Sequence, residues 1–504
     1  MTSPSLLTEA PEAAQGVSLA HYIGGQWERE DGPTFPVVNP GTGQELGKAP
    51  IASRETVDRA VQSAKSALEA WRLTTPKERG EYLHKLADLI QASGHDLAIL
   101  ESLNVGRPLS QTLEEIPPVV DVLRFYAGAF RANAASAAGH YERGTTSVLL
   151  REPIGVLGLI TPWNFPLTEA LWKVAPALAA GNTIVLKPSE NTPYTTVALA
   201  GLIDSVFPPG VVNVVLGDGT TGAAIVDHPD IAMVSLTGDG STGKKIAAAA
   251  SNTLKRVQLE LGGKAPVLVF EDADVSRAAS YLAQAAFINA GQVCTAPCRL
   301  IVHDAVYEDF LSKYLEEVRD LRVGDPFDPA SQIGPLISER QMDRVLGFLE
   351  RAEATSASIL TGGGRMQQPG FFVEPTVVAD VGQDNELVQK EVFGPVVTIQ
   401  RSSSEKEMLQ WANDVDYGLS AGLWTSDLDR SLELMSSLKF GTIWVNGHHT
   451  TVPEMPFGGF GQSGYGKVLS AQSIDEYSQL KHVMMISADR GGRTARKQFR
   501  AILP

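Results

Sequence analysis

Apolar residues recur every three to four positions between residues 52 and 103. The run SRETVDRAVQSAKSALEAW begins with Ser53 and has Glu55 close after it, and the run PKERGEYLHKLADLIQASG ends on Gly94. This spacing is that of an amphipathic helix, and a serine before a helix and a glycine after it are common end signals. The segment therefore predicts two helices, the second of which stops at Gly94.

The pattern changes from residue 148 onward. Short runs rich in β-branched residues, such as NTIVLKP, VVNVVLG and APVLVFED, alternate with helical stretches such as LTEALWKVAPALAAG. This alternation is typical of βαβ units and a parallel sheet. A second alternating block follows residue 263, with strands expected in RLIVHDAV, VVTIQ and TIWVNG. The sequence therefore predicts an α/β protein with two domains joined near residue 262.

Composition narrows the class of partner. The 504 residues include 43% hydrophobic side chains and carry a net charge of −16, which argues against a nucleic-acid partner because a polyanion needs a basic face. No apolar stretch is long enough to span a membrane, and the N-terminal segment lacks the basic start of a secretory signal. Two cysteines do not make a disulfide framework, so we expect a cytoplasmic protein. Residues 491–504 form a basic C-terminal tail, which we expect to be solvated.

Two glycine-rich loops follow predicted strands. GDGTTG at 217–222 and GDGSTG at 238–243 both match the G-x-G-x-x-G pattern of dinucleotide-binding turns. The two loops cannot both be the dinucleotide-binding turn. If the second loop were that turn, Glu260 would be the acid that binds the ribose. The loops predict a nucleotide-binding α/β domain without fixing which residues bind.

Cys294 and Cys298 lie four positions apart in GQVCTAPCR. A zinc site needs three or four ligands, and the chain has no third cysteine, so no metal site is predicted. The spacing also differs from the C-x-x-C redox motif. Spacing alone leaves two interpretations of Cys294, a buried small residue or a nucleophile.

Six motifs in order resemble the NAD(P)-dependent aldehyde dehydrogenase superfamily between residues 20 and 487. They are TPWNFP with Asn164, VLKPSE with Lys187 and Glu190, LELGGKAP with Glu260, GQVCTAPCR with Cys294, EVFGPV with Glu391 and Phe393, and PFGGFGQSGYGK with Phe457. The resemblance implies that fold: a Rossmann-like NAD-binding domain (1–137 and 153–262), an α/β catalytic domain (263–477) and a small β oligomerisation element (138–152 and 478–490). It also implies a homodimer or homotetramer and a mode of dinucleotide binding without the usual glycine fingerprint.

The resemblance assigns three catalytic roles. Aldehyde oxidation needs a nucleophile that makes a tetrahedral carbon, donors for its oxyanion and a base that activates water for thioester hydrolysis. Cys294, Asn164 and Glu260 would fill these roles, with the Cys294 backbone N–H as the second oxyanion donor. Cys298 would only pack beside the active loop.

The resemblance also implies the cofactor contacts. Glu190 would accept hydrogen bonds from the ribose hydroxyls and repel a 2′-phosphate, so we expect NAD to be preferred over NADP. Asp239 departs from the family's usual Ser, and it suits the site only if its side chain caps the following helix. The expected cofactor-binding residues are Thr161, Pro162, Trp163, Lys187, Ser189, Glu190, Gly217, Thr221, Thr237, Gly238, Thr242, Leu261, Gly262, Glu391 and Phe393.

A narrower resemblance is to aminobutyraldehyde and betaine-aldehyde dehydrogenases, carried by EEIPPVVDVLRFYAGA, GQVCTAPCR and WVNGHHTTVPEMPFGG. Residues 165, 169 and 172 share one helix face. Glu169 either complements the helix dipole or, with Asp121, attracts a substrate ammonium between aromatic faces. The small-molecule partner is therefore expected to be an ω-aminoaldehyde such as 4-aminobutanal, met by Asp121, Phe165, Glu169, Trp172, Trp444 and Phe457. A broad-specificity aldehyde dehydrogenase, a thiol esterase and a non-catalytic binding protein of the same fold stay open.

Overall fold

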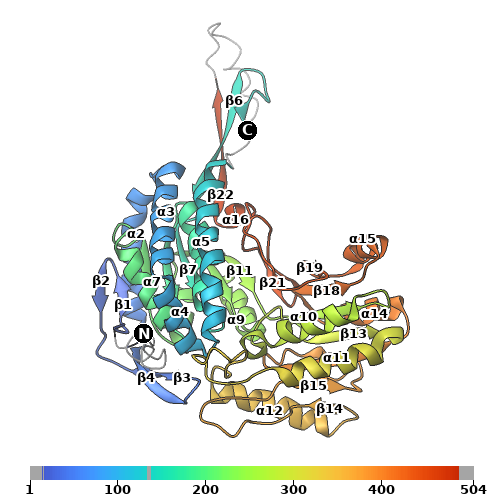
Figure 1. Ribbon diagram of the computed structural model, residues 1–504. Helices are drawn as coiled ribbons and strands as arrows, with labels where there is room; N and C mark the ends of the chain where they lie inside the picture. The colour runs from blue at the N-terminus through green and yellow to red at the C-terminus, as the bar shows by residue number, and fades with distance from the viewer. Residues whose placement is uncertain (1–13, 15, 133–137, 487–504) are drawn as a thin grey trace.

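The computed structural model describes residues 14, 16–132 and 138–486, and the predicted C-terminal tail lies outside them. Figure 1 shows two α/β lobes, blue to green and yellow to red, with a narrow β extension rising from the first lobe. The predicted α/β class with parallel sheets is confirmed. No helix of the described chain is long and apolar enough to cross a membrane.

The first sheet runs in the order β2-β1-β9-β8-β7-β10-β11-β21, and its five central strands are parallel. From β7, the chain proceeds to β8 and β9 on one side and to β10 and β11 on the other. Such a reversal opens a crevice at the carboxyl ends of the strands, where α/β proteins bind ligands. The strands are β1 (His21–Ile23), β2 (Gln26–Glu28), β7 (Val156–Ile160), β8 (Thr183–Lys187), β9 (Val212–Val214), β10 (Ile231–Thr237), β11 (Arg256–Glu260) and β21 (Gly464–Tyr465).

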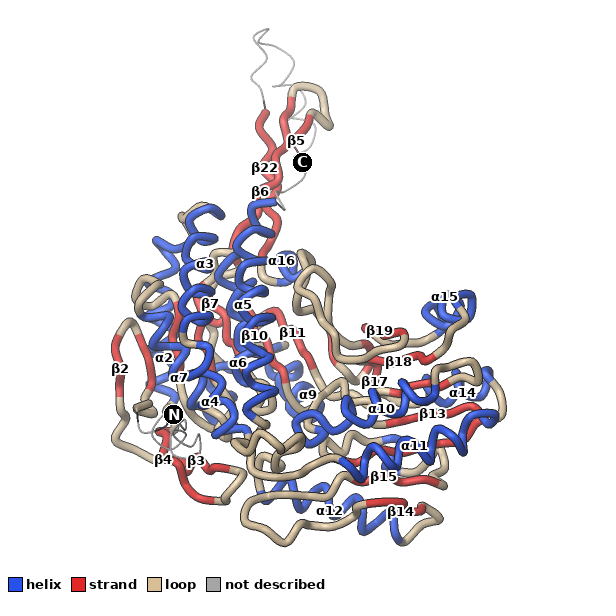
Figure 2. Tube along the Cα trace, viewed as in Figure 1, coloured by secondary structure: helices blue, strands red, loops and turns tan. Residues whose placement is uncertain are grey.

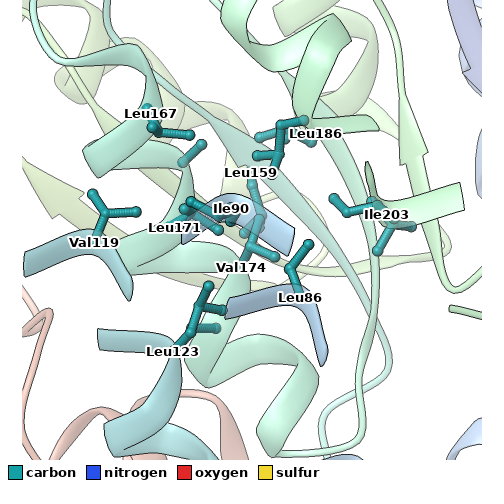
Figure 3. Packing of buried hydrophobic residues seen from close by; sticks show 14 of the residues in the cluster. Leu86, Ile90, Val119, Leu123, Leu159, Leu167, Leu171, Val174, Leu186 and Ile203 are labelled. Carbon is teal, nitrogen blue, oxygen red and sulfur yellow. The ribbon is translucent and has the colours of Figure 1, made fainter. Parts of the chain in front are cut away.

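Helices cover both faces of this sheet, so the central strands β7, β8 and β9 have no solvent-facing side. Leu157 and Leu159 of β7 join one core cluster, whereas Val156 and Ile160 join the cluster on the opposite face. In Figure 3, Leu159 lies against Leu171 and Val174 in the first cluster. The helices on that face are α3 (Pro76–Ala92), α5 (Leu109–Ala132), α6 (Pro166–Ala179) and α7 (Tyr194–Asp204); α2 (Arg54–Trp71), α8 (Gly219–Asp227) and α9 (Gly240–Ala250) contribute to the other.

The two predicted N-terminal helices are α2 and α3. The Ser53 side chain accepts a hydrogen bond from the backbone N–H of Thr56, and Thr75 forms a reciprocal capping box with Glu78. Helix α3 ends at Ala92, two residues before the predicted stop at Gly94. The further helix that begins there, α4 (Gly94–Val105), was not predicted from the sequence. That helix ends at Gly106, whose φ of 89° is left-handed.

The second sheet has the order β14-β15-β16-β13-β12-β18-β19 and is parallel except at β14. Its strands are β12 (Pro266–Val269), β13 (Arg299–His303), β14 (Ser358–Thr361), β15 (Thr376–Ala379), β16 (Val396–Ser402), β18 (Ser420–Trp424) and β19 (Thr442–Val445). The helices of this lobe are α10 (Val275–Phe287), α11 (Tyr307–Asp320), α12 (Glu339–Glu353), α13 (Glu386–Gln389), α14 (Glu405–Asn413) and α15 (Leu428–Ser437). The step from the first sheet to the second falls between Glu260, the end of β11, and Pro266, the start of β12.

The β extension pairs two segments that are far apart in sequence. Strand β22 (Ser478–Ile486) runs antiparallel to β6 (Thr145–Pro153), which also pairs with β5 (Ala138–Gly139), and Figure 2 shows this ribbon projecting beyond the helices. Before it, β21 returns to pair with β11 of the first sheet. The other described elements are β3 (Thr34–Asn39), β4 (Gln44–Pro50), β17 (Tyr417–Gly418), β20 (Phe460–Gly461) and α16 (Ser473–Glu476).

Candidate active site

A cavity of about 430 Å³ lies where the loops after β7, β10 and β11 meet the second lobe. Its position is the one that the strand reversal predicts. All three predicted catalytic residues, Cys294, Glu260 and Asn164, line it. Eight of the predicted cofactor residues line it as well: Pro162, Trp163, Thr237, Gly238, Leu261, Gly262, Glu391 and Phe393.

Cys294 follows a tightly turned segment after α10. Asn289, Ala290 and Gly291 all have positive φ, and a side chain at Gly291 would collide with the carbonyl of Gly394. The side chain of Gln292 accepts from the Ile337 backbone N–H at 2.9 Å and donates to the Asn289 carbonyl at 2.9 Å. These bonds fix the loop that presents the thiol.

Asn164 is bound to the same loop. Its Nδ2 donates to the Gln292 carbonyl at 3.0 Å, and Asn289 Nδ2 donates to the Asn164 carbonyl at 3.1 Å. The Asn164 amide is thus held in the cavity wall that Cys294 shares. A fixed amide donor beside a nucleophile suits stabilisation of an oxyanion.

The thiol of Cys294 is held in a setting that disfavours its charged form. Burial, and then the negative charges of Glu169, Glu391 and Glu260, raise its pKa well above the usual value. A nucleophilic thiolate at this position therefore needs a proton acceptor nearby.

Glu260 ends β11 with its carboxylate inside the cavity. The residue is 4% exposed, and neither carboxylate oxygen has a hydrogen-bond partner among the described residues. Burial raises the pKa of Glu260 well above its usual value, against the opposing effect of Lys173. Gly458 passes so close that a Cβ there would lie 2.5 Å from Glu260 Oε1. A buried, unbonded carboxylate of raised pKa has the properties of a general base.

The loop with Glu391 and Phe393 closes the other side of the cavity. Glu391 accepts a hydrogen bond from the Gly263 backbone N–H at 2.8 Å, and a side chain at Gly262 would collide with its carboxylate. Burial raises the pKa of Glu391 to about 7. Phe393 has a φ of 59° and its ring meets that of Trp163 edge-on, with centroids 5.2 Å apart.

The remaining cofactor residues lie along the carboxyl edge of the first sheet, outside the cavity lining. The Thr161 backbone N–H donates to the Lys187 carbonyl at 3.1 Å, and Lys187 Nζ is 3.9 Å from the Glu190 carboxylate. Thr161 Oγ1 is buried without a hydrogen-bond partner among the described residues, which leaves a polar group for a ligand. Ser189 accepts from the Asn191 backbone N–H at 3.3 Å.

The two glycine loops have different structures. In the first, the Thr221 hydroxyl donates to the Ala52 carbonyl at 2.9 Å, and Gly217 leaves no room for a Cβ beside Thr221. In the second, Asp239 caps α9 by accepting a hydrogen bond from the Ser241 backbone N–H at 2.8 Å. This cap is the condition on which an acid at that position was expected to suit the site. Thr242, in the same loop, is exposed. Asp239 nevertheless lines the cavity.

A second cavity, of about 360 Å³, approaches Cys294 from the opposite side. The predicted substrate residues Phe165, Glu169, Trp172 and Phe457 line it, and the rings of Trp172 and Phe457 meet at 5.3 Å. Among the described residues, only Glu169 and Cys294 line both cavities. The two cavities therefore meet at the thiol, as a cofactor site and a substrate site must.

Two predicted substrate residues are not in this cavity. Asp121 lies on the exposed side of α5 and does not line it. Trp444 lies behind the wall, where its Nε1 donates to the Thr450 carbonyl at 2.8 Å and its ring packs 4.4 Å from that of His448. Asp121 lies on α5 and Trp444 on β19, and residue spacing does not reveal which neighbours cover a side chain.

Several lining residues escaped the sequence analysis. Arg344 donates to the Glu391 carbonyl at 2.7 Å, and Gln341 donates to the Phe393 carbonyl at 2.7 Å. Both donors lie on α12, which therefore holds the loop with Glu391 and Phe393 in place. The sequence of α12 has only the pattern of an ordinary amphipathic helix. In the substrate cavity the missed residues include Arg107, Gln111, Glu114, Glu115 and His449. The acidic pair in QTLEEIPP, Glu114 and Glu115, lies in the first turns of α5 and faces this cavity.

Cys298 is a free thiol that lies with Lys264 in a narrow gap behind the Cys294 loop. Within residues 14, 16–132 and 138–486, no group of three or more His, Cys, Asp or Glu side chains is placed to hold a metal ion.

Comparison with known proteins gives the family. The profile of the aldehyde dehydrogenase family matches residues 27–483. Betaine aldehyde dehydrogenase of Bacillus subtilis is 39% identical over 476 residues, covering 93% of this chain and 97% of its own. Retinal dehydrogenase 2 of Mus musculus is 40% identical over 473 residues, covering 92% and 90%. The crystal structure of betaine aldehyde dehydrogenase from Staphylococcus aureus in complex with NAD+ superposes with a TM-score of 0.94, at 33% identity and with 97% and 99% of the chains covered. The profile match over residues 27–483 and the identity with these relatives show that this chain belongs to the aldehyde dehydrogenase family.

Proposed function

We propose that the protein oxidises a positively charged aldehyde, an ω-aminoaldehyde such as 4-aminobutanal, to the carboxylic acid with NAD. The chemistry follows from the junction of the two cavities at Cys294. An aldehyde in the substrate cavity presents its carbonyl carbon to the thiolate, and the Asn164 amide stabilises the oxygen that becomes negative. When bound, NAD accepts the hydride from that carbon. Glu260 then takes a proton from the water that hydrolyses the thioester and frees Cys294.

The residues present fit a dinucleotide. The Thr161 hydroxyl is a buried polar atom without a partner among the described residues, and Lys187 and Glu190 lie beside it at the end of β8. Glu391 and Phe393 would position the nicotinamide end, because their loop borders Cys294 from the cofactor side. Glu190 would accept hydrogen bonds from ribose hydroxyls, which favours NAD over NADP.

The acidic lining of the substrate cavity carries the proposal for a cationic substrate. Glu114, Glu115 and Glu169 line it against one cation, Arg107. Glu115 pairs with Arg107, and Glu169 has Lys173 one turn further along α6. Glu114 is exposed, lines the cavity and has no ion-pair partner among the described residues. An ammonium at the far end of the substrate would therefore meet Glu114 at the cavity mouth.

A second candidate is an aldehyde whose cationic group lies next to the carbonyl, as in betaine aldehyde. Glu169 lines the cavity at the Cys294 end, and the rings of Phe165, Trp172 and Phe457 would face such a cation. Lys173 weakens this alternative because it already opposes the charge of Glu169. A neutral aldehyde would use the apolar walls alone.

A substrate panel tests the proposal. We expect a higher kcat/KM for 4-aminobutanal and 3-aminopropanal than for butanal or betaine aldehyde, measured as NADH formation. Glu114→Gln should raise KM for 4-aminobutanal about tenfold, because it removes a charge-assisted contact, and should leave butanal unchanged. Asp121→Asn is the matched control, since Asp121 lies on the same helix outside the cavity.

Equal kcat/KM for butanal and 4-aminobutanal in the unmodified enzyme would remove the cationic-substrate proposal and favour a broad-specificity aldehyde dehydrogenase. A preference for betaine aldehyde would indicate that the cationic group of the substrate binds at the end of the cavity next to Cys294. Ester hydrolysis without any NADH formation from the aldehydes would instead support a thiol esterase.

A further inference from the structure

Glu169 occupies a position that the proposed chemistry has not used. It shares with Cys294 the junction of the cofactor and substrate cavities, whereas Glu260 and Asn164 line the cofactor cavity alone. It is 6% exposed, and its Oε2 atom has no hydrogen-bond partner among the described residues. The Thr237 hydroxyl lies near the carboxylate. A buried carboxylate beside a half-buried thiol is placed to exchange a proton with it.

Charge conservation favours this exchange. A thiol that loses its proton to bulk water adds a negative charge to a buried site that already contains Glu169, Glu391 and Glu260. A thiol that passes its proton to Glu169 leaves the total charge of the site unchanged, because the negative charge only moves from carboxylate oxygen to sulfur. Creating an extra buried charge is the costlier process.

Lys173 keeps Glu169 able to accept the proton. It lies one turn further along α6, is fully buried, and its Nζ has no hydrogen-bond partner among the described residues. Glu169 and Glu260 are the carboxylates whose charges act on it. Burial raises the pKa of Glu169 while Lys173 lowers it, and Glu115 on α5 raises it further. The net effect raises the pKa of Glu169, and a raised pKa makes a carboxylate a better proton acceptor.

We propose that Glu169 is the proton acceptor that activates Cys294, so that Glu260 is kept for the hydrolytic water. In the first step the S–H bond of Cys294 breaks and its proton goes to Glu169, which becomes a neutral carboxylic acid. The thiolate then forms the C–S bond to the aldehyde carbon. Hydrolysis of the thioester breaks the C–S bond and gives the carboxylate product and the thiolate. The two protons of the attacking water leave to solvent, one of them through Glu260, and the thiolate recovers its proton from Glu169.

Alkylation of Cys294 by iodoacetamide tests this step without an aldehyde, so its outcome is independent of the proposed substrate. The second-order rate constant is measured against pH for the full-length enzyme and for Glu169→Gln. If Glu169 is the acceptor, the rate constant of Glu169→Gln should rise at a pH about one unit or more above that of the unmodified enzyme. The thiol of the variant must then ionise without a proton acceptor, in a site that disfavours its charge. Cys294→Ala gives the background from Cys298, and Asp121→Asn should match the unmodified enzyme.

The opposite shift would overturn the proposal. If Glu169 acts only as a fixed negative charge, Glu169→Gln relieves its repulsion of the thiolate and moves the inflection to lower pH. An unchanged profile also contradicts it. Glu169→Asp, which keeps a carboxylate, should recover part of the rate and serves if the glutamine variant does not fold.

Transient kinetics separate Glu169 from Glu260. Glu169→Gln should slow the first release of NADH by about 100-fold, the usual scale of general base catalysis. Glu260→Gln should leave that first release fast and slow the later turnover. A slow burst in Glu260→Gln together with a normal burst in Glu169→Gln would assign both proton transfers to Glu260.

Discussion

At the scale of single residues, three carboxylates around Cys294 differ in their surroundings. Glu391 accepts a backbone hydrogen bond from Gly263, which fixes its orientation. Glu260 has no partner among the described residues, and Glu169 has Lys173 on its own helix. Pairs of titratable groups with different environments take different tasks in acid–base chemistry. The three positions thus suit cofactor positioning, water activation and thiol activation.

Glu190 is expected to set the choice of cofactor. Its carboxylate lies 3.9 Å from Lys187 Nζ at the end of β8. We expect a higher kcat/KM with NAD than with NADP, and Glu190→Gln should reduce that preference about tenfold by removing charge-assisted bonds worth about 1.5–3 kcal/mol and the repulsion of a 2′-phosphate. Steady-state kinetics with both cofactors measure this; a preference of the unmodified enzyme for NADP would contradict it.

The three residues predicted to be catalytic lie together in one cavity, whereas only four of the six predicted substrate residues share the other. Cys294, Glu260 and Asn164 stand in motifs whose order identifies them, and the structure places all three in one cavity. Asp121 and Trp444 were expected at the substrate, yet both lie outside its cavity. Motifs preserve the identity of reacting groups, whereas the depth of a side chain depends on packing between distant segments.

At the scale of elements, a buried ionic cluster joins three helices beside the substrate cavity. Arg107 pairs with Glu115 of α5 and lies 3.3 Å from Glu101 of α4, while Thr168 of α6 donates to Glu115. The Arg107 guanidinium also lies 4.4 Å from the ring centroid of Phe165. Burial and then the charge of Glu115 raise the pKa of Glu101, against the opposing charge of Arg107.

Arg107→Met should therefore lower the free energy of unfolding by about 3–5 kcal/mol, because it leaves a buried carboxylate without its cation. Denaturant-induced unfolding measures the change. Arg124→Met is the matched control: Arg124 forms an exposed pair with Asp88 at 3.1 Å, worth at most about 1 kcal/mol. Equal destabilisation by the two substitutions would contradict this account of the cluster.

Helix α5 shows why element prediction was incomplete. It runs from Leu109 to Ala132 through Pro117 and Pro118, residues that normally end or kink a helix. Its buried side chains pack against α3 and α6, and tertiary packing of this kind outweighs local propensity. The β-rich and helical runs after residue 148 were predicted correctly because burial on both sheet faces leaves unbroken apolar strands.

At the scale of the whole molecule, the projecting β ribbon has no partner on its outer edge within the described chain. Strand β22 lies at the edge of its sheet. Leu480, Met484 and Ile486 alternate along it and are 55%, 47% and 65% exposed. An edge strand with exposed apolar residues favours pairing with another chain.

We therefore expect a homodimer or homotetramer in solution, measured by light scattering after size exclusion. Replacing Leu480 and Met484 together by Glu should reduce the oligomer to single chains. Leu73→Glu, at a similarly exposed site on the body, should leave the mass unchanged. A single chain at micromolar concentration in the unmodified protein would contradict this expectation.

The central claim is that Cys294 carries the acyl group and Glu260 releases it by activating water. The most direct measurement combines rapid-mixing NADH absorbance with intact-protein mass spectrometry of Glu260→Gln, mixed with NAD and 4-aminobutanal. The account predicts about one NADH per active site in a fast burst, negligible further turnover, and a protein heavier by the acyl group on Cys294. Sustained turnover of Glu260→Gln, or a burst without an adduct on Cys294, would contradict it.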